Sequence, residues 1–216
     1  MIVAPRSPTR ARLKVFADKR YSYLRALEYE LIPDLDLRGS ILDFGGGRKV
    51  GYLHLLRFDG PIDSLNIDPH LDPTILHDAN TPFPIADAAY DTIISFNTLE
   101  HVRRDEFALS ELVRILRPGG RLHIVVPFLY RVHGSPSDYH RHTAFWWEAA
   151  LESLGIPRDQ SRIEPIMWGR MTTAFSFLEY TRLRFLRRMP HWGDLVVRGI
   201  ADYECPLGYY ISGTKP

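Results

Sequence analysis

The chain has 216 residues, of which 45% are hydrophobic and 25% are charged, and its formal net charge is +1. These values are typical of one compact domain with a sizeable core, and the near-zero charge argues against a general nucleic-acid-binding protein. The single cysteine, Cys205, excludes an internal disulfide and fits a reducing compartment. Residues 1–5 lack the apolar core of a signal peptide, and no stretch has the length of a membrane-spanning helix. We therefore expect a single cytoplasmic domain over residues 1–216.

Helices and strands alternate through the first half of the chain. Apolar residues at spacings of three and four predict a helix over residues 9–32, which Pro33 ends. Short apolar runs after it predict strands, with one helix between the first two. These elements are a strand at 40–44, a helix at 49–56, and strands at 64–68 and 74–77.

The second half continues this alternation. Asp105 is expected to cap a helix over 106–116, and Thr143 a helix that runs to Leu154. The run 122–126 is continuously apolar, as in a strand inside a parallel sheet. The remaining predicted elements are a strand at 92–96, two last strands at 163–167 and 209–213, and a helical insertion at 170–200 between those two. This order predicts an α/β fold.

The first strand ends in a glycine-rich motif. Its Asp-x-Gly-x-Gly pattern consists of Asp43, Gly45 and Gly47, and Asp68 closes the next strand. Glycines let the backbone approach a ligand closely, and an acid at the end of the second strand can accept hydrogen bonds from ribose hydroxyls. The pattern differs from the dinucleotide fingerprint, because Val50 stands where the third glycine of that fingerprint is expected.

Four further blocks follow in a fixed order. They are His77–Pro84, Tyr90–Asn97, Leu99–Val102 (LEHV) and Leu116–Leu122. Together with the glycine-rich motif, they resemble the ordered motifs of class I S-adenosylmethionine (SAM) methyltransferases over residues 40–127. The resemblance implies a Rossmann-like α/β fold with a seven-stranded, mostly parallel sheet and helices on both faces. It also implies that residues 40–156 form the SAM-binding core.

The same resemblance assigns cofactor contacts to the strand ends. Gly45 and Gly47 would border the methionine part of SAM, and Asp43 would order the turn or contact the amino group through water. The remaining contacts are ribose hydroxyls for Asp68, the adenine edge for Asp78 and the Ala79 backbone, and the methionine carboxylate or methyl face for Asn97. Each also has a simpler interpretation: a tight turn for the glycines, a helix cap for Asp68, and turn residues for Asp78 and Asn97. Phe44 or Ile67 could pack on the nucleoside, and the sequence does not separate them from core residues.

The loop after the strand 122–126 is unusually rich in polar and aromatic side chains. Its HG-x-P-x-DY-x-R-x-T run resembles type 11-like methyltransferases of sugar, cell-surface polysaccharide and natural-product pathways. We therefore expect substrate contacts from Tyr130, Asp138, Tyr139 and Arg141. The alternative is that Asp138 and Arg141 pair to fold the loop.

Methyl transfer to an oxygen or nitrogen requires a positioned acceptor and, for an alcohol or amine, a group that takes its proton. Histidine has a pKa suited to this role, and the candidates are His101 in LEHV, then His133 and His140. We expect no metal, because the sequence shows no convincing carboxylate cluster near these histidines.

Two basic and aromatic segments flank the core. Residues 9–32 and 170–200 are expected to form a lid near the acceptor, which would attract an anionic group such as a sugar phosphate. A solvated basic face, peripheral contact with an anionic membrane surface, and a homodimer formed through the apolar insertion are alternatives.

The resulting hypothesis is a SAM-dependent methyltransferase that acts on a small-molecule or glycan acceptor, most readily at oxygen. A SAM-binding but inactive partner subunit is one alternative, and a protein or RNA methyltransferase is another. The Asn-Pro-Pro-Tyr type motif of amino-directed nucleic-acid enzymes is absent after Asn97, where Thr98, Leu99 and Glu100 follow.

Overall fold

A computed structural model describes residues 1–5, 21–134, 136–178, 181–183, 194 and 204–216. Seven strands form one sheet in the order β3-β2-β1-β4-β5-β7-β6. The strands are β1 (Ile41–Phe44), β2 (Ile62–Asn66), β3 (Ile75–Leu76), β4 (Tyr90–Phe96), β5 (Leu116–Pro127), β6 (Ser161–Ile166) and β7 (Gly208–Thr214). The pairs from β3 to β5 are parallel, whereas β7 runs antiparallel to both β5 and β6. The predicted seven-stranded, mostly parallel sheet is therefore confirmed.

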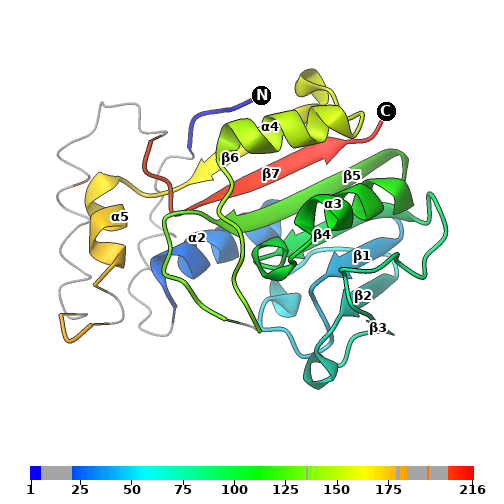
Figure 1. The fold of residues 1–216 in the computed structure, drawn as a ribbon, viewed down its shortest axis with the longest axis horizontal. Coiled ribbons are helices and arrows are strands. Elements are labelled where there is room, and N and C mark those ends of the chain that lie inside the picture. The colour runs from blue at the N-terminus through cyan, green and yellow to red at the C-terminus, as the bar shows by residue number, and fades with distance from the viewer. Residues whose placement is uncertain (6–20, 135, 179–180, 184–193, 195–203) are drawn as a thin grey trace.

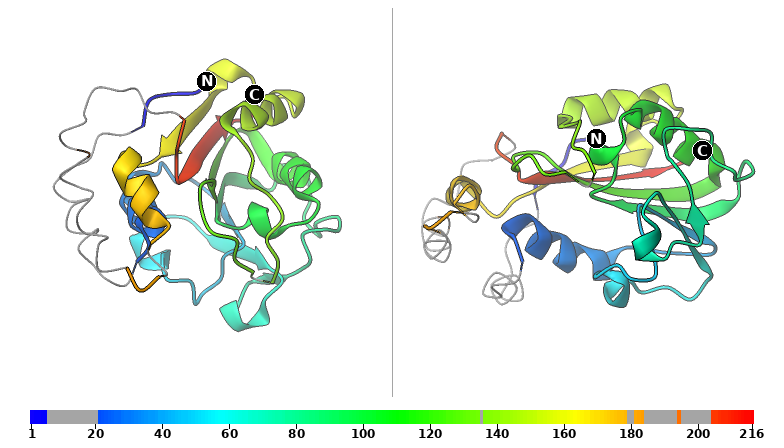
Figure 2. Two further views of the ribbon diagram at one scale, coloured as in Figure 1. Left: turned by 60° about the vertical axis from the view of Figure 1, so that its left-hand side comes forward. Right: turned by 60° about the horizontal axis from the view of Figure 1, so that its bottom comes forward.

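Helices cover both faces of the sheet. They are α2 (Tyr23–Leu31), α3 (Asp105–Ile115), α4 (Ala144–Ser153) and α5 (Arg170–Ser176). The views show α3 and α4 on one face and α2 on the other (Figures 1 and 2). No helix in the described ranges is long and apolar enough to cross a membrane.

Alternation along β1 divides the core between the two faces. Leu42 and Phe44 belong to the cluster under α3 and α4, whereas Ile41 belongs to the cluster under α2. Because side chains alternate along a strand, Asp43 shares the α2 face with Ile41. The sheet order reverses between β1 and β4, since β2 and β3 extend it one way and β5 the other. Such a switch point is where open α/β sheets bind ligands, beyond the carboxyl ends of the strands.

Several predicted elements differ from the structure. β5 begins at Leu116, before the predicted strand 122–126, and α3 begins at Asp105, which is therefore not its cap. The helix expected over 9–32 is not continuous, because Ser22 is extended and its side chain caps α2 by accepting from the Arg25 amide at 3.2 Å. Residues 6–20 lie outside the described part. The second predicted strand is displaced by two residues and ends at Asn66, because Asp68 caps a short 3-10 turn, Pro69–Leu71.

The predicted helix at 49–56 was wrong. Its backbone hydrogen bonds join residues three apart, such as Leu53 to Val50 and Leu56 to Leu53, and only Leu53–Leu55 forms a 3-10 turn. This tight path brings Tyr52 under β1, where its hydroxyl reaches Asp43. A long-range contact thus replaces the helix that apolar spacing suggests. Of the insertion predicted at 170–200, the helix α5 is described, and most of the rest lies outside the described ranges.

Candidate active site

The glycine-rich turn after β1 is held by the two neighbouring strands. Gly45 has a φ of +86°, its amide donates to Leu65 O at 2.8 Å, and a Cβ here would lie 1.9 Å from Thr98 Oγ1. The side-chain amide of Asn66 donates to the carbonyls of Gly45 at 2.6 Å and Gly46 at 3.1 Å. Asn66 was not predicted, because nothing in the sequence shows that the last residue of β2 turns toward the loop after β1.

Asp43 is buried under this turn. Both of its carboxyl oxygens accept from the Tyr52 hydroxyl, at 2.8 and 2.9 Å. Burial raises the pKa of Asp43 to about 7, although the hydrogen bond from Tyr52 opposes this shift. A Cβ on Gly46 would lie 1.8 Å from Asp43 Oδ2, so the backbone passes directly over the carboxyl group. The first of the two predicted roles, ordering the turn, fits this geometry; a contact with the cofactor's amino group stays a prediction.

Asp68 and Ile67 follow the end of β2. Asp68 is half-buried, and its Oδ1 accepts from the His70 amide at 2.9 Å, so it does cap the turn Pro69–Leu71. One oxygen suffices for that cap, which leaves Oδ2 able to accept a ribose hydroxyl. Of the two apolar candidates, Phe44 is 1% exposed in the core whereas Ile67 is 54% exposed. Ile67 is therefore the side chain that can cover a nucleoside.

Asp78 and Ala79 lie beyond the end of β3. Asp78 is exposed, and its Oδ1 accepts from the Asn80 amide at 2.9 Å and from the Asn80 side chain at 2.8 Å. These hydrogen bonds, led by that from the backbone, lower the pKa of Asp78. Asp78 thus folds its own turn, as the simpler interpretation expects, while Ala79 is half-buried against the core. A contact with adenine stays a prediction for both.

Asn97 joins the end of β4 to α2. It has a φ of +50°, and its side-chain amide donates to Glu28 Oε2 at 3.0 Å. Glu28 is 1% exposed, and burial raises its pKa although Arg25 lies 3.6 Å away. Asn97 is thus a turn residue whose side chain ties α2 to the carboxyl end of the sheet, and its contact with the cofactor stays a prediction.

A cleft of about 540 Å³ opens beside the glycine-rich turn. Residues from α2, from the segment after the turn, from β4 and from the loop after β5 surround it. They are Tyr21, Ser22, Arg25, Tyr29, Lys49, Val50, Gly51, Tyr52, Leu71, Phe96 and Tyr130. Tyr130, predicted to contact substrate, thus borders the same cleft as the residues that follow the glycines.

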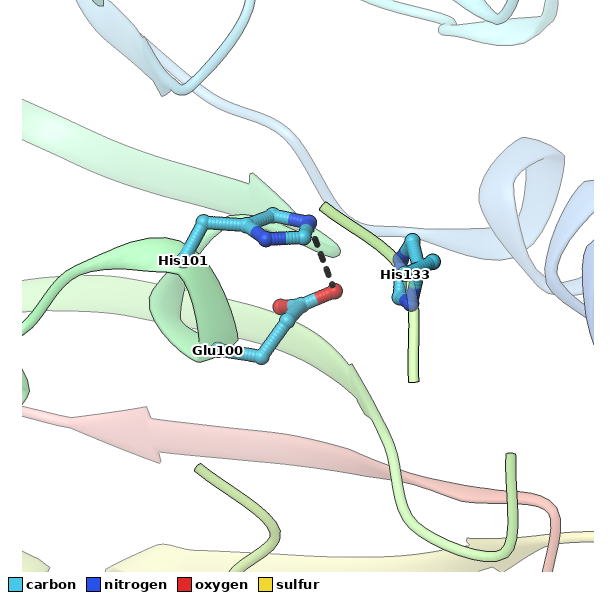
Figure 3. Close-up of side chains that lie close together, drawn as sticks. All are labelled: Glu100, His101 and His133. Atoms are coloured by element: carbon cyan, nitrogen blue, oxygen red, sulfur yellow. Dashed lines mark ion pairs between the residues drawn. The ribbon is translucent and has the colours of Figure 1, made fainter. Parts of the chain in front are cut away.

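A cluster of Glu100, His101 and His133, here called the Glu100 cluster, lies at the carboxyl ends of β4 and β5 (Figure 3). His101 Nε2 is 3.6 Å from Glu100 Oε1, and the rings of His101 and His133 meet edge to face at 4.9 Å. Burial raises the pKa of Glu100 to about 8, and the nearby Glu28 carboxyl adds to the shift. Sequence reasoning named the two histidines and missed Glu100, whose burial depends on the loop folding over it.

The loop after β5 is folded by an ion pair. Arg141 donates to both carboxylate oxygens of Asp138 at 2.5 Å, and the His133 amide donates to Asp138 Oδ2 at 2.9 Å. The alternative that Asp138 and Arg141 pair to fold the loop is therefore confirmed. Tyr139 is anchored by its amide to Glu100 O at 2.8 Å while its side chain is 49% exposed, so it stays a candidate for substrate contact.

His140 lies in a second cluster with Asp105 and His142, here called the Asp105 cluster. His140 Nε2 is 3.2 Å from Arg103 O and 3.4 Å from Asp105 Oδ1. His142 Nε2 is 2.5 Å from Asp105 Oδ2, and its ring stacks on Trp146. The structure therefore brings His101 and His133 together and places His140 in a different constellation.

Comparisons with known proteins agree with this arrangement. Residues 43–124 match a family model, type 11, described as a methyltransferase domain. Curated relatives named as uncharacterised methyltransferases of Mycobacterium bovis and Mycobacterium tuberculosis are 28% identical over 151 residues. The match covers 55% of this chain, and the chain spans only 58% of the length of those relatives.

Solved structures show the same fold. A methyltransferase in complex with the Haloferax volcanii Trm112 activator is similar with a TM-score of 0.58 and 18% identity, over 95% of this chain and 94% of that one. A SAM-dependent methyltransferase of Thermotoga maritima is similar with a TM-score of 0.58 and 16% identity, over 94% of each chain. Residues 43–124 therefore match the methyltransferase domain model, and the chain has the fold of SAM-dependent methyltransferases.

Proposed function

We propose that this protein is a SAM-dependent methyltransferase that acts on a small-molecule or glycan acceptor. The observation that carries this proposal is the switch point of the sheet in the matched domain: the glycine-rich turn follows β1 there and Asp68 follows β2. Open α/β sheets bind their ligands at this position. The segment after the turn, from Lys49 to Tyr52, lines the 540 Å³ cleft.

The described residues fit the cofactor. Gly45 and Gly47 keep the turn free of side chains, Asp68 has an oxygen for the ribose hydroxyls, and exposed Ile67 offers an apolar surface to the nucleoside. Asp78 and Ala79 follow β3, and the family resemblance assigns them to the adenine edge. When bound, SAM supplies an electrophilic methyl group on a sulfonium sulfur.

The acceptor side is assigned to the loop after β5 and the Glu100 cluster. The loop starts at the carboxyl end of β5, on the side of the sheet where ligands are expected (Figure 1). Within this loop, Tyr130 lines the cleft and the Tyr139 side chain is exposed. The basic side chains Arg25 and Lys49 line the neighbouring cleft and favour an anionic acceptor such as a sugar phosphate. A lid formed by residues 9–32 and 170–200 stays a prediction, as do a homodimer and a cytoplasmic location.

His101 is the histidine that we assign as general base for an acceptor hydroxyl. Ser137 O, at 2.5 Å from Nδ1, holds the ring in one orientation and leaves the lone pair on Nε2. Glu100 Oε1 lies 3.6 Å from Nε2, so Glu100 in its ionised form would stabilise the imidazolium that forms on proton uptake.

The test is transfer of a labelled methyl group from SAM to a panel of hydroxylated acceptors (sugar phosphates, nucleotide sugars and phenols) and, beside them, a panel of amines. Wild type and Asp59→Ala, a control for an exposed acid before β2, should label an acceptor, and Asp68→Ala should not. Label on amines alone would contradict transfer to oxygen. A folded wild type that binds the cofactor and labels no acceptor would favour the inactive partner subunit.

A further inference from the structure

The two rings of the Glu100 cluster are held through their Nδ1 atoms. His101 Nδ1 lies 2.5 Å from Ser137 O, and His133 Nδ1 lies 3.2 Å from Arg131 O and 3.3 Å from Asp138 Oδ2. Carbonyl and carboxylate oxygens only accept hydrogen bonds, so each Nδ1 carries the proton in the neutral ring. The Nε2 atom of each ring therefore keeps its lone pair.

Glu100 supplies a carboxylate that lacks a proton donor. Its side chain is 1% exposed, and neither carboxyl oxygen has a hydrogen-bond partner in the described part of the chain. A buried carboxylate without a donor is unfavourable unless a cation or proton compensates it. The atom that faces Oε1, His101 Nε2, is itself a lone-pair acceptor when the ring is neutral. Two acceptors face each other, so either a proton held by Glu100 or a cation must lie between or beside them.

The three side chains converge on one point. One ring nitrogen of each histidine and one carboxyl oxygen of Glu100 lie within 4.8 Å of one another, and Figure 3 shows the Glu100 carboxyl group directed at the His101 ring. Two imidazoles and one carboxylate, with an open position for water, form a common ligand set for zinc and non-haem iron. Ligand histidines in such sites donate their other ring N–H to a carbonyl or carboxylate, as both rings do here.

The Asp105 cluster has the same residue types but is satisfied internally. His142 donates from Nε2 to Asp105 Oδ2, the Glu106 amide donates to Asp105 Oδ1, and His140 Nε2 faces the Arg103 carbonyl. Its histidine atoms therefore have acceptors already, and its carboxylate has donors. Of these two clusters, only the Glu100 cluster leaves a carboxylate without a donor.

We propose that Glu100, His101 and His133 form a binding site for a divalent transition-metal ion such as Zn²⁺. Glu100 closes the buried side of the site, whereas the histidine side chains are 12% and 25% exposed and leave the remaining coordination positions to water or a ligand. An ion on His101 Nε2 occupies the lone pair that proton uptake needs. Metal binding and general-base action by His101 therefore exclude each other, and this consequence rests on the proposed function.

The test is calorimetric titration of Zn²⁺ into untagged protein that has been dialysed against a chelator, without cofactor or acceptor. Wild type should bind one ion per chain. Glu100→Gln and His133→Gln should each lower the affinity by a factor of at least about 10, because each removes one ligand. The matched variants Asp105→Asn and His142→Gln, which change the same residue types in the Asp105 cluster, should keep the wild-type affinity.

Near-ultraviolet circular dichroism would establish that each variant is folded. His133→Gln affects a partly exposed loop residue, so it still tests the site if Glu100→Gln fails to fold. Absence of binding by folded wild type would overturn the proposal, as would unchanged affinity in both variants of the Glu100 cluster. Loss of affinity only in the Asp105-cluster variants would overturn it too. Because no methyl transfer is measured, these outcomes are separate from success or failure of the proposed function.

Discussion

Gly45 and Gly119 share a backbone conformation and differ in their surroundings. Their φ angles are +86° and +76°, but a Cβ on Gly45 would overlap Thr98, whereas nothing lies within 4 Å of a Cβ on Gly119. The first position therefore combines conformational strain with a steric clash, and the second has strain alone. Position 45 therefore requires glycine for two reasons: its positive φ angle and the contact that a Cβ would make with Thr98.

We expect Gly119→Ala to lower the free energy of unfolding by about 1 kcal/mol, the cost of a left-handed backbone for a residue with a Cβ. Gly45→Ala should cost more, because Thr98 or the turn must move, and it should also weaken cofactor binding. Urea denaturation of both variants measures the difference. Equal destabilisation by the two substitutions would show that Thr98 does not constrain the turn.

Asp43 makes stability depend on pH. Its folded-state pKa of about 7 exceeds the unfolded value of about 3.9, so the folded state holds a proton that the unfolded state releases. The free energy of unfolding therefore falls as the pH rises from about 4 to about 7, because over this range only the unfolded state gives up the proton of Asp43.

Asp43→Asn removes this dependence while it keeps an oxygen for the Tyr52 hydroxyl. Relative to wild type, the variant should gain about 3 kcal/mol in the free energy of unfolding between about pH 5 and about pH 8. Denaturant titrations of both proteins at the two pH values give the comparison. A difference between the proteins that does not change with pH would mean that Asp43 is ionised across the whole range.

For single residues, the sequence predicted which ones lie at the strand ends, but not which residues form hydrogen bonds with them. Asp43 is the penultimate residue of β1, beside the turn that holds Gly45 and Gly47, and Asp68 follows β2. These positions follow from the local sequence, because the apolar runs and the glycines mark where each strand ends. The bonds from Asn66 to the glycine carbonyls and from Asn97 to Glu28 join residues 20 or more positions apart. Such contacts depend on how the strands assemble, so residue order alone does not reveal them.

Among the elements, α4 has the clearest local signal. Thr143 was predicted as its cap, and the Thr143 side chain accepts from the Trp146 amide at 3.3 Å. The helix places Trp147 and Leu151 in the core under the sheet, where both are at most 1% exposed. The cap by Thr143 and the apolar face both indicate the same helix, so α4 could be predicted from the sequence.

Thr143→Ala should therefore lower the free energy of unfolding by about 1 kcal/mol. Ser153→Ala, at the exposed other end of the same helix, is the control and should change it by less than about 0.5 kcal/mol. Thermal or denaturant unfolding of the two variants tests this. If the two effects were equal, the cap would not contribute to the stability of α4.

Elements that depend on distant contacts were predicted less well. The segment 49–56 has helical spacing, but it forms turns because Tyr52 is drawn under β1 to Asp43. The start of α2 at Tyr23 follows from the cap by Ser22, a residue that the apolar pattern passes over. The periodicity of apolar residues detects neither a helix cap nor a buried hydrogen bond. The cap by Ser22 sets the start of α2, and the bond between Tyr52 and Asp43 accompanies the turns at 49–56.

For the whole molecule, the topology of the sheet determines where the candidate active site lies. Because β1, β2, β4 and β5 are parallel, their carboxyl ends lie on one side of the sheet, and the loop after β5 starts from that same side (Figure 2). The order of the strands reverses between β1 and β4. The family resemblance predicted this topology well because its motifs follow the strands of the core. It does not predict the acceptor, since folds of this kind carry many functions and the residues around the acceptor vary.

The central claim is that this switch point binds the SAM scaffold, and calorimetric titration with S-adenosylhomocysteine tests it most directly. Wild type and Asp59→Ala should bind with a Kd of about micromolar order, and Asp68→Ala should bind about 10- to 100-fold more weakly because a charged hydrogen-bond acceptor is lost. Absence of binding by folded wild type, or equal binding by Asp68→Ala, would contradict the account.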